Sequence, residues 1–173
     1  MTRLDDLLQH MRQFAELPAI DGETPLRSYG ELASGIEAWA GKLADRGIGA
    51  GDVIALKADY CFDAIALLFA ALKAQAVLAL IPPAGEISGY LRDSHARWLC
   101  EMTPSGEARW ERLDAAVDHP LLQELRRKEQ GGIVIFTSGS SGRPKAALQG
   151  AEGFLGKFLR PGRRMRTLAF LLF

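Results

Sequence analysis

The sequence has 173 residues, 48% of them hydrophobic and 24% charged, proportions typical of an ordinary globular protein with one buried core. Lysine plus arginine and aspartate plus glutamate each number 21, so the formal net charge is zero and no basic surface for nucleic acid is expected. The longest uncharged apolar run, 64–72, is far shorter than the roughly 20 residues that span a bilayer, and no secretory signal opens the chain. These features predict a cytoplasmic protein with no transmembrane segment.

The first half of the chain predicts helices that alternate with short strands. Leu4, Leu7, Leu8, Met11 and Phe14 recur at helical spacing before a stop at Pro18. Ser28 and Glu31 have the spacing of a capping box, and the amphipathic helix behind them is expected to end at Gly47. The elements predicted next are a strand over 53–56, a helix over 60–74, a strand over 77–81, a helix over 87–93 and a strand over 98–100.

The second half continues this alternation after an irregular stretch. Residues 102–117 are weakly patterned and predict a loop or a small hairpin. A buried strand is expected over 133–136, and later segments predict a strand over 146–148, a helix over 153–159 and a strand over 167–173. The whole pattern predicts an α/β fold with a mostly parallel sheet flanked by helices.

One more helix is expected between these segments. Asp118 is the predicted N-cap, and Pro120 is tolerated in the first turn, where its missing N–H costs nothing. The side chains expected to face inward are Leu121, Leu122 and Leu125.

The two cysteines and three tryptophans are expected to be structural. Cys61 and Cys100 are well apart and have no metal-ligand spacing. They predict two buried thiols in a reducing cytoplasm, and a single disulfide between them is the alternative. Trp39, Trp98 and Trp110 are expected to pack in or beside the core.

The most specific feature is the segment 137–145, Thr-Ser-Gly-Ser-Ser-Gly-Arg-Pro-Lys, which follows an apolar strand directly. Its two glycines let backbone N–H groups curve around an anion, and Pro144 stiffens the approach to the final lysine. Such a segment predicts a loop that holds the phosphates of a nucleotide. Its side-chain donors are Thr137, Ser138, Ser140, Ser141 and Lys145.

Three other interpretations of this segment fit less well. A Walker loop needs four residues between its first glycine and a contiguous Gly-Lys, whereas Gly139 and Gly142 are two residues apart. A nucleophile elbow needs a glycine where Arg143 stands. A flexible Ser/Gly surface loop seldom follows a buried strand directly and ends in Arg-Pro-Lys.

Residues 133–146 closely resemble the signature loop of the adenylate-forming superfamily, which comprises acyl-CoA synthetases, non-ribosomal peptide synthetase adenylation domains and luciferases. Segments 28–32, 43–52 and 70–77 are similar to its amino-terminal landmarks and occur in the same order. The resemblance covers essentially the whole chain and is weakest over 101–120.

The sequence departs from the superfamily pattern at four points. Ser141 stands for the usual threonine and keeps the hydroxyl, and Ala146 stands for the glycine after the lysine, which should restrict the backbone there. Gln75 replaces a customary glycine before a buried strand, and the usual histidine beyond Leu148 is missing. These changes bear on how the substrate is handled rather than on the family resemblance.

In that superfamily an enzyme uses ATP and Mg²⁺ to convert a carboxylic acid, such as a fatty acid, into an acyl-adenylate. The acyl group then passes to coenzyme A or to the phosphopantetheine of a carrier protein. The resemblance implies these substrates and cofactors here, with Lys145 as the catalytic side chain and no metal ligand in this chain. By position, the implied contacts to the β- and γ-phosphates are Thr137, Ser138, Gly139, Ser140, Ser141, Gly142 and Lys145.

The resemblance also implies that residues 1–173 are the N-terminal α/β subdomain of an AMP-binding domain. The superfamily's adenine, ribose and Mg²⁺ ligands and its C-terminal-domain lysine have no counterpart, and the chain stops inside the apolar run 168–173. We therefore expect the remainder of the enzyme, or a second copy of the chain, to cover this end. A stand-alone non-catalytic nucleotide- or phosphate-binding module is the alternative, as is a degenerate relative; an open reading frame that continues past Phe173 would favour the enzyme fragment.

The first testable prediction is that purified residues 1–173 form no acyl-adenylate. Without ligands for adenine, ribose and Mg²⁺, ATP is not oriented for in-line attack by a carboxylate. The measurement is carboxylate-dependent exchange of labelled pyrophosphate into ATP, for which we expect no signal above a protein-free control. Exchange that depends on an added acid would show that this chain already holds a complete site.

Overall fold

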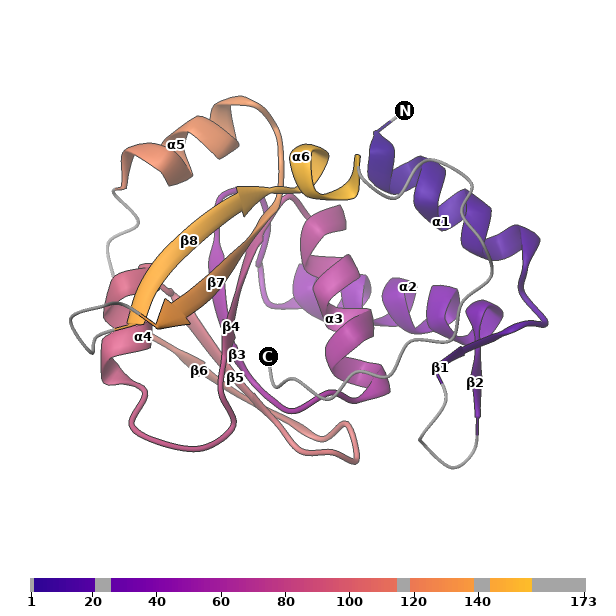
Figure 1. Cartoon of the computed structure of the whole chain (residues 1–173), viewed down its shortest axis with the longest axis horizontal. Coiled ribbons are helices and arrows are strands. Elements are labelled where there is room, and N and C mark those ends of the chain that lie inside the picture. The colour runs from indigo at the N-terminus through magenta and orange to yellow at the C-terminus, as the bar shows by residue number, and fades with distance from the viewer. Residues whose placement is uncertain (1, 21–25, 115–118, 139–143, 157–173) are drawn as a thin grey trace.

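The computed structural model describes residues 2–20, 26–114, 119–138 and 144–156. The helices are α1 (Arg3–Gln13), α2 (Tyr29–Asp45), α3 (Phe62–Lys73), α4 (Ser88–Ser94), α5 (Pro120–Arg127) and α6 (Ala151–Leu155). The strands are β1 (Pro18–Ile20), β2 (Arg27–Ser28), β3 (Val53–Lys57), β4 (Val77–Ile81), β5 (Trp98–Met102), β6 (Ala108–Arg112), β7 (Gly132–Ser138) and β8 (Pro144–Gly150). Figure 1 shows them as a layer of strands between two layers of helices.

Six of these strands form one mixed sheet in the order β6-β5-β3-β4-β7-β8. The four inner strands are parallel, and the two outer strands, β6 and β8, pair antiparallel to their neighbours. Strands β1 and β2 form a separate two-stranded sheet. The predicted α/β class with a mostly parallel sheet is therefore confirmed.

The two faces of the sheet carry separate hydrophobic cores. Along β3, Ile54 and Leu56 pack into one core and Val53 and Ala55 into the other, because successive side chains point to opposite faces. We call the first face the α3 face, since α1, α2, α3 and α6 contribute to it, and the second the α4 face, since α4 and α5 cover it. Each inner strand is thus buried on both sides, as expected of parallel sheets.

The helix boundaries follow from the capping chemistry in the sequence. Ser28 Oγ accepts the N–H of Glu31 at 3.2 Å, and the Glu31 carboxylate accepts the N–H of Ser28 at 2.8 Å, so the predicted capping box of α2 is confirmed. Gly47 follows this helix with φ +66°, as predicted for a glycine stop. Thr2 and Asp5 form a second capping box, which starts α1.

Two details of α5 differ from the sequence-based prediction. The N-cap is His119 rather than Asp118, because the ring Nδ1 of His119 accepts the N–H of Leu121 at 3.3 Å; Asp118 itself lies outside the described residues. The Leu121 side chain is 51% exposed instead of facing inward. Leu122 and Leu125 are buried as predicted, and their three-residue spacing alone defines the apolar stripe of this short helix.

The segment predicted as a loop or a small hairpin supplies one strand, β6, which forms a hairpin with the preceding strand β5 rather than within the segment itself. Strand β6 pairs antiparallel with β5 from Trp98 opposite Arg112 to Met102 opposite Ala108. Helix α6 begins at Ala151, two residues before the predicted start. The strand predicted over 167–173 lies outside the described residues.

The cysteines and tryptophans have the structural roles predicted for them. Neither Cys61 nor Cys100 forms a disulfide, and both are buried. Burial raises the pKa of the Cys100 thiol to about 12, so this sulfur stays protonated and unreactive. Trp39 is buried, where its indole N–H donates to Asp63 at 2.7 Å.

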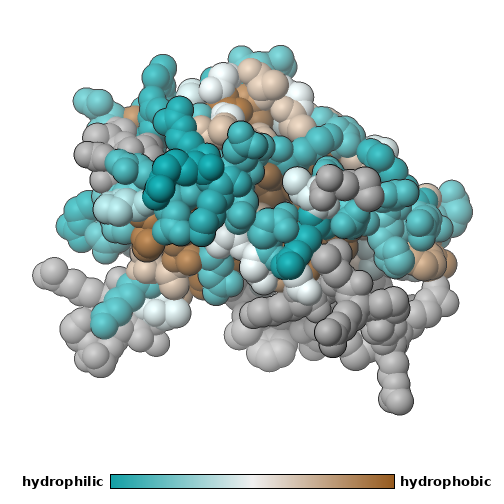
Figure 2. Space-filling model, turned by 90° about the horizontal axis from the view of Figure 1, so that it is seen from above, coloured by the Kyte–Doolittle hydropathy of each residue, from teal (hydrophilic) through white to brown (hydrophobic). Residues whose placement is uncertain are grey.

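The surface shown in Figure 2 is mostly hydrophilic, with hydrophobic residues in small separate areas. In the part of the chain that the structure describes, no helix combines the length and the apolar character needed to cross a bilayer.

The Gln75 backbone adopts a conformation that glycine would adopt more easily. Gln75 follows α3 at φ +58°, while the N–H of Ala76 donates to Ala71 at 2.9 Å and that of Gln75 to Leu72 at 3.1 Å. This pair of bonds is the Schellman motif, whose left-handed residue is usually glycine. The departure from the superfamily pattern at this position therefore carries a backbone cost.

The second prediction is that Gln75→Gly stabilises the fold by about 1 kcal/mol, because it removes the clash between Cβ and backbone in the left-handed region. Gln75→Ala keeps the Cβ and is the matched control, which should give no such gain. The measurement is urea unfolding followed by circular dichroism. A Gln75→Gly variant less stable than Gln75→Ala would contradict the assignment of strain to this residue.

Candidate functional site

The segment singled out in the sequence joins the two strands of an antiparallel hairpin. Strands β7 and β8 pair from Gly132 opposite Gly150 to Ser138 opposite Pro144. The five residues between them, 139–143, lie outside the described residues, and with them the predicted contacts of Gly139, Ser140, Ser141 and Gly142. The described part of the site is therefore the pair of strands that supports the loop.

Thr137 and Lys145 are brought together by the register of this hairpin. They stand directly opposite each other, and both are exposed. Directly opposed residues project from the same face of an antiparallel pair, with Cβ atoms about 4.5–5.5 Å apart. One hydroxyl and one ammonium group thus share the mouth of the loop, on the α3 face. Ser138, also predicted to bind phosphate, pairs through its backbone with Pro144.

The strand register also shows what alanine in place of glycine means for the backbone at position 146. This residue lies in β8 opposite Phe136, as an ordinary strand residue. It is not among the described residues with positive φ. Alanine here needs no conformation reserved for glycine, so this departure from the superfamily pattern leaves the lysine in a regular strand.

The loop lies at the edge of the sheet where α/β proteins bind ligands. Strands β3, β4, β5 and β7 are parallel, so their carboxyl ends meet at one edge, and β7 leads into the loop there. Strand β3 continues into α3 on one face and β4 into α4 on the other. Such a reversal opens a crevice between the two strand ends, the usual position of a ligand in open α/β sheets.

At the end of the hairpin far from the loop, the neighbouring atoms leave no room for a side chain on Gly132. A Cβ at Gly132 would lie 2.8 Å from the carbonyl oxygen of Gln149 and 2.9 Å from Leu125 Cδ1. The N–H of Gly132 donates to Ala76 at 3.1 Å, which ties β7 to the start of β4. Glycine therefore lets α5 and β8 close on β7 at the end far from the loop.

Helix α1 reaches the residues that follow the hairpin. Arg3 donates to the backbone carbonyl of Glu152 and lies 3.4 Å from its carboxylate. The N–H of Arg3 also donates to the Glu152 carboxylate at 3.2 Å. The amino-terminal helix thus anchors α6, and through it the end of β8.

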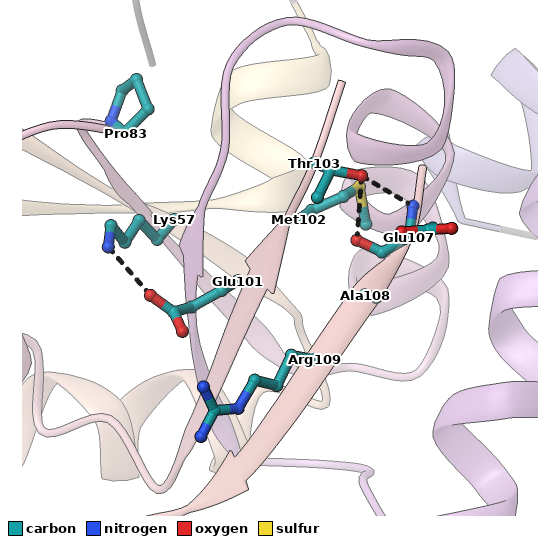
Figure 3. Close-up of a pocket in the computed structure, with 8 residues that line it drawn as sticks. All are labelled: Lys57, Pro83, Glu101, Met102, Thr103, Glu107, Ala108 and Arg109. Atoms are coloured by element: carbon teal, nitrogen blue, oxygen red, sulfur yellow. Dashed lines mark hydrogen bonds and ion pairs between the residues drawn. The ribbon is translucent and has the colours of Figure 1, made fainter. Parts of the chain in front are cut away.

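A pocket of about 570 Å³ lies at the same carboxyl edge, near β5 and β6, and the sequence analysis did not identify it (Figure 3). Lys57 and Glu101 stand opposite each other on β3 and β5, with Nζ and Oε1 2.8 Å apart. Arg109 is opposite Glu101 on β6. In the sequence, the signal that could have indicated this pocket is a charged residue near the end of each of two apolar strands. The pocket is lined by Lys57, Pro83, Glu101, Met102, Thr103, Glu107, Ala108 and Arg109.

The charges of this pocket do not select an anion. Its two cations are matched by the carboxylates of Glu101 and Glu107, and the Lys57 ammonium is already paired. That hydrogen bond, with smaller help from the Arg109 charge, lowers the pKa of Glu101. The mouth of the hairpin, in contrast, presents the Lys145 ammonium at an exposed position. Between the two sites, the hairpin is the better match for a polyphosphate.

No group of three or more His, Cys, Asp or Glu side chains in the described ranges is arranged to hold a metal ion.

Comparison with known proteins matches one family model and several relatives. A model of the family described as AMP-binding enzyme matches residues 7–158. Malformin synthetase mlfA of Aspergillus neoniger is 28% identical in an alignment 168 residues long that covers 90% of this chain. Its counterpart from Aspergillus tubingensis is 29% identical in an alignment 154 residues long that covers 82%. The chain spans only 3% of the length of each of these relatives.

Solved structures show the same fold at low sequence identity. The N-terminal subdomain of Klebsiella oxytoca NpsA in complex with 3-hydroxybenzoyl-AMSN is 21% identical with a TM-score of 0.62, over 86% of this chain and 41% of that one. The inhibitor-bound N-terminal domain of FACL13 from Mycobacterium tuberculosis is 20% identical with a TM-score of 0.64, over 87% and 44%. The artificially fused NpsA-ThdA from Klebsiella oxytoca is 21% identical with a TM-score of 0.66, over 90% and 34%.

The third prediction concerns the Lys57–Glu101 pair. In the folded protein the pKa of Glu101 is lowered from its ordinary value of 4.5. Glu101 therefore contributes stability that is present above pH 4.5 and is lost as the pH falls through its lower folded-state pKa. Glu101→Gln should cost about 0.5 kcal/mol at pH 7, since the carboxylate is 37% exposed and solvent screens the pair. In acid, where Glu101 is protonated, Glu101→Gln should no longer lower the free energy of unfolding. Urea unfolding between pH 7 and pH 3 measures it, with the exposed Glu111→Gln as control; an equal cost at both ends of this range would contradict the ion-pair explanation.

Proposed function

The chain belongs to the AMP-binding enzyme family of adenylate-forming enzymes, and on that premise we propose that it is the N-terminal α/β subdomain of an ATP-dependent acid-activating ligase. In this proposal the loop 137–145 binds the β- and γ-phosphates of ATP. The observation that carries the proposal is the opposition of Thr137 and Lys145 across the mouth of the hairpin, at the carboxyl edge of a parallel sheet.

The role of the loop follows from where negative charge develops. An oxygen of the substrate carboxylate bonds to the α-phosphorus of ATP while the bond from that phosphorus to the β-phosphate oxygen breaks. The leaving pyrophosphate takes the electron pair of that bond. The Lys145 ammonium, the Thr137 hydroxyl and backbone N–H groups of the loop stabilise this charge best when they are fixed before the reaction. When bound, Mg²⁺ supplies further neutralisation of the phosphates.

We further propose that a thiol then receives the acyl group, and that this thiol is the phosphopantetheine of a carrier protein. Support comes from the malformin synthetases and from NpsA-ThdA, described as an adenylation-PCP di-domain NRPS. Coenzyme A, which would fit acyl-CoA synthetase chemistry, is the other acceptor. The ligands for adenine, ribose and Mg²⁺ are assigned to residues outside this chain. Two cysteines that form no disulfide fit a reducing, cytoplasmic setting.

Because the acid is unknown, the test of activity uses a panel. The protein that contains this chain is assayed for pyrophosphate exchange with amino acids, aryl acids and fatty acids. Transfer of the activated acid to a carrier protein or to coenzyme A then separates the two acceptors. Exchange with none of the acids would leave the alternative of a non-catalytic phosphate-binding module.

The fourth prediction is that Lys145→Ala in that protein lowers the adenylation rate by roughly 10- to 1000-fold, the range for removal of one preorganised donor. Part of the loss should fall on the KM for ATP rather than on the KM for the acid. Ser140→Ala should cost less, because neighbouring N–H groups and Ser141 share its role. The measurement is steady-state adenylation at saturating acid.

Lys128→Ala provides the matched control for the lost charge, since Lys128 is the C-cap of α5 and its ammonium lies 2.6 Å from the Glu124 carboxylate. Its kinetics should equal those of the wild type. If Lys145→Ala keeps the wild-type kcat and the wild-type KM for ATP, Lys145 has no role in binding phosphate.

A further inference from the structure

The loop end of the hairpin extends beyond the parallel part of the sheet. Strand β7 pairs with β4 only at Gly132, Ile133 and Val134. Among the described residues, β8 is the one partner of its last four residues, 135–138. A two-stranded ribbon is at best marginally stable without packing on at least one face. The phosphate loop is therefore carried on the least supported part of the sheet, and side-chain packing has to hold it in place.

On the α4 face, that packing is provided by two aromatic rings. Phe136 lies in the overhanging part of β7, next to Thr137 and on the opposite face of the strand. The Tyr90 ring of α4 meets the Phe136 ring edge to face, with centroids 4.7 Å apart and planes at 87°. This is a favoured geometry for aromatic pairs. Figure 1 shows α4 beside the end of the hairpin that carries the loop, whereas α5 lies toward the other end.

Helix α4 is itself fixed well enough to act as a support. Ser94 Oγ donates to the carbonyl of Tyr90 at 2.7 Å, and Ser94 is buried. The helix ends at His95 in the left-handed conformation, with the N–H of Ala96 bonded to Leu91. Leu91 and Ile87 pack into the same core as Tyr90. The Tyr90 ring thus projects from a helix with a fixed C-terminal end. It packs against the part of β7 that, within the described ranges, has β8 as its one ladder partner.

We propose that Tyr90 is a positioning residue for the phosphate loop, acting through Phe136. The inference rests on the proposed function of residues 137–145. Contact between the two rings fixes the direction in which β7 leaves the sheet, and hence where the Thr137 hydroxyl and the Lys145 ammonium stand relative to a bound polyphosphate. Tyr90 touches no phosphate itself. Its loss changes the geometry of the donors but not their number.

The experiment measures binding of inorganic tripolyphosphate and of ATP with Mg²⁺ to the protein that contains this chain, by isothermal titration calorimetry. Neither probe requires knowledge of the acid. Tyr90→Leu, which keeps apolar bulk but removes the ring, should weaken both by about 3- to 10-fold, the equivalent of an aromatic pair. Tyr90→Phe keeps the ring and should bind like the wild type. Phe136→Leu should match Tyr90→Leu, and the double variant should lose little more.

Leu122→Val serves as the control for a merely structural effect. Leu122 is buried in the same core, on α5, so its truncation should lower the unfolding temperature without weakening tripolyphosphate binding. If Tyr90→Leu or Phe136→Leu folds and binds tripolyphosphate as tightly as the wild type, the positioning role is overturned while the phosphate role of the loop stands. If the wild type binds neither probe, the phosphate role itself fails and the inference fails with it. An additive double variant would also overturn the inference, because the two rings would then act separately.

Discussion

The structure depends on the burial of β3 and β4. In β3 the residues from Val53 to Leu56 are fully shielded from water, and in β4 those from Val77 to Ala79 are at most 1% exposed. Strands without a solvent face need helices on both sides and parallel neighbours, because the crossover connections supply those helices. The rest of the layered fold follows from this requirement. Parallel strands also bring their carboxyl ends to one edge, which concentrates every possible site there.

The antiparallel pairing of β7 with the edge strand β8 allows a short loop at the carboxyl edge of the sheet. A parallel strand would have to continue into a crossover, whereas β7 returns at once as β8 and leaves a short connection at the carboxyl edge. The cost is that the loop end leaves the ladder after Val134 and relies on side-chain packing. Placement of the Lys145 ammonium is therefore a property of α4 and of the hairpin together, and not of the loop sequence alone.

The sequence was sufficient to predict the strands that are buried on both faces and the helix start at Ser28, because uninterrupted apolar runs and a capping box are local signals. The sequence was insufficient to predict details for which two neighbouring residues compete, such as the N-cap of α5 and the leucines that this helix buries. His119 caps α5 in place of Asp118, and Leu121 points away from the core because Leu122 and Leu125 already fill the contact. The Lys57–Glu101 pair and the contact of Tyr90 with Phe136 depend on strand register and helix docking, which no single segment encodes. The segment 137–145 could be singled out because its hydroxyl groups, glycines and lysine follow one another in the sequence.

The central claim is that the hairpin mouth, and not the pocket around Lys57 and Glu101, receives the phosphates of ATP. Titration of ¹⁵N-labelled chain with ATP and Mg²⁺, followed by amide chemical shifts, tests it most directly. Our account predicts that the largest shifts fall within 137–145, with smaller ones at Phe136 and Tyr90. Shifts that centre on Lys57, Glu101 and Arg109, with Thr137 and Lys145 unmoved, would contradict it.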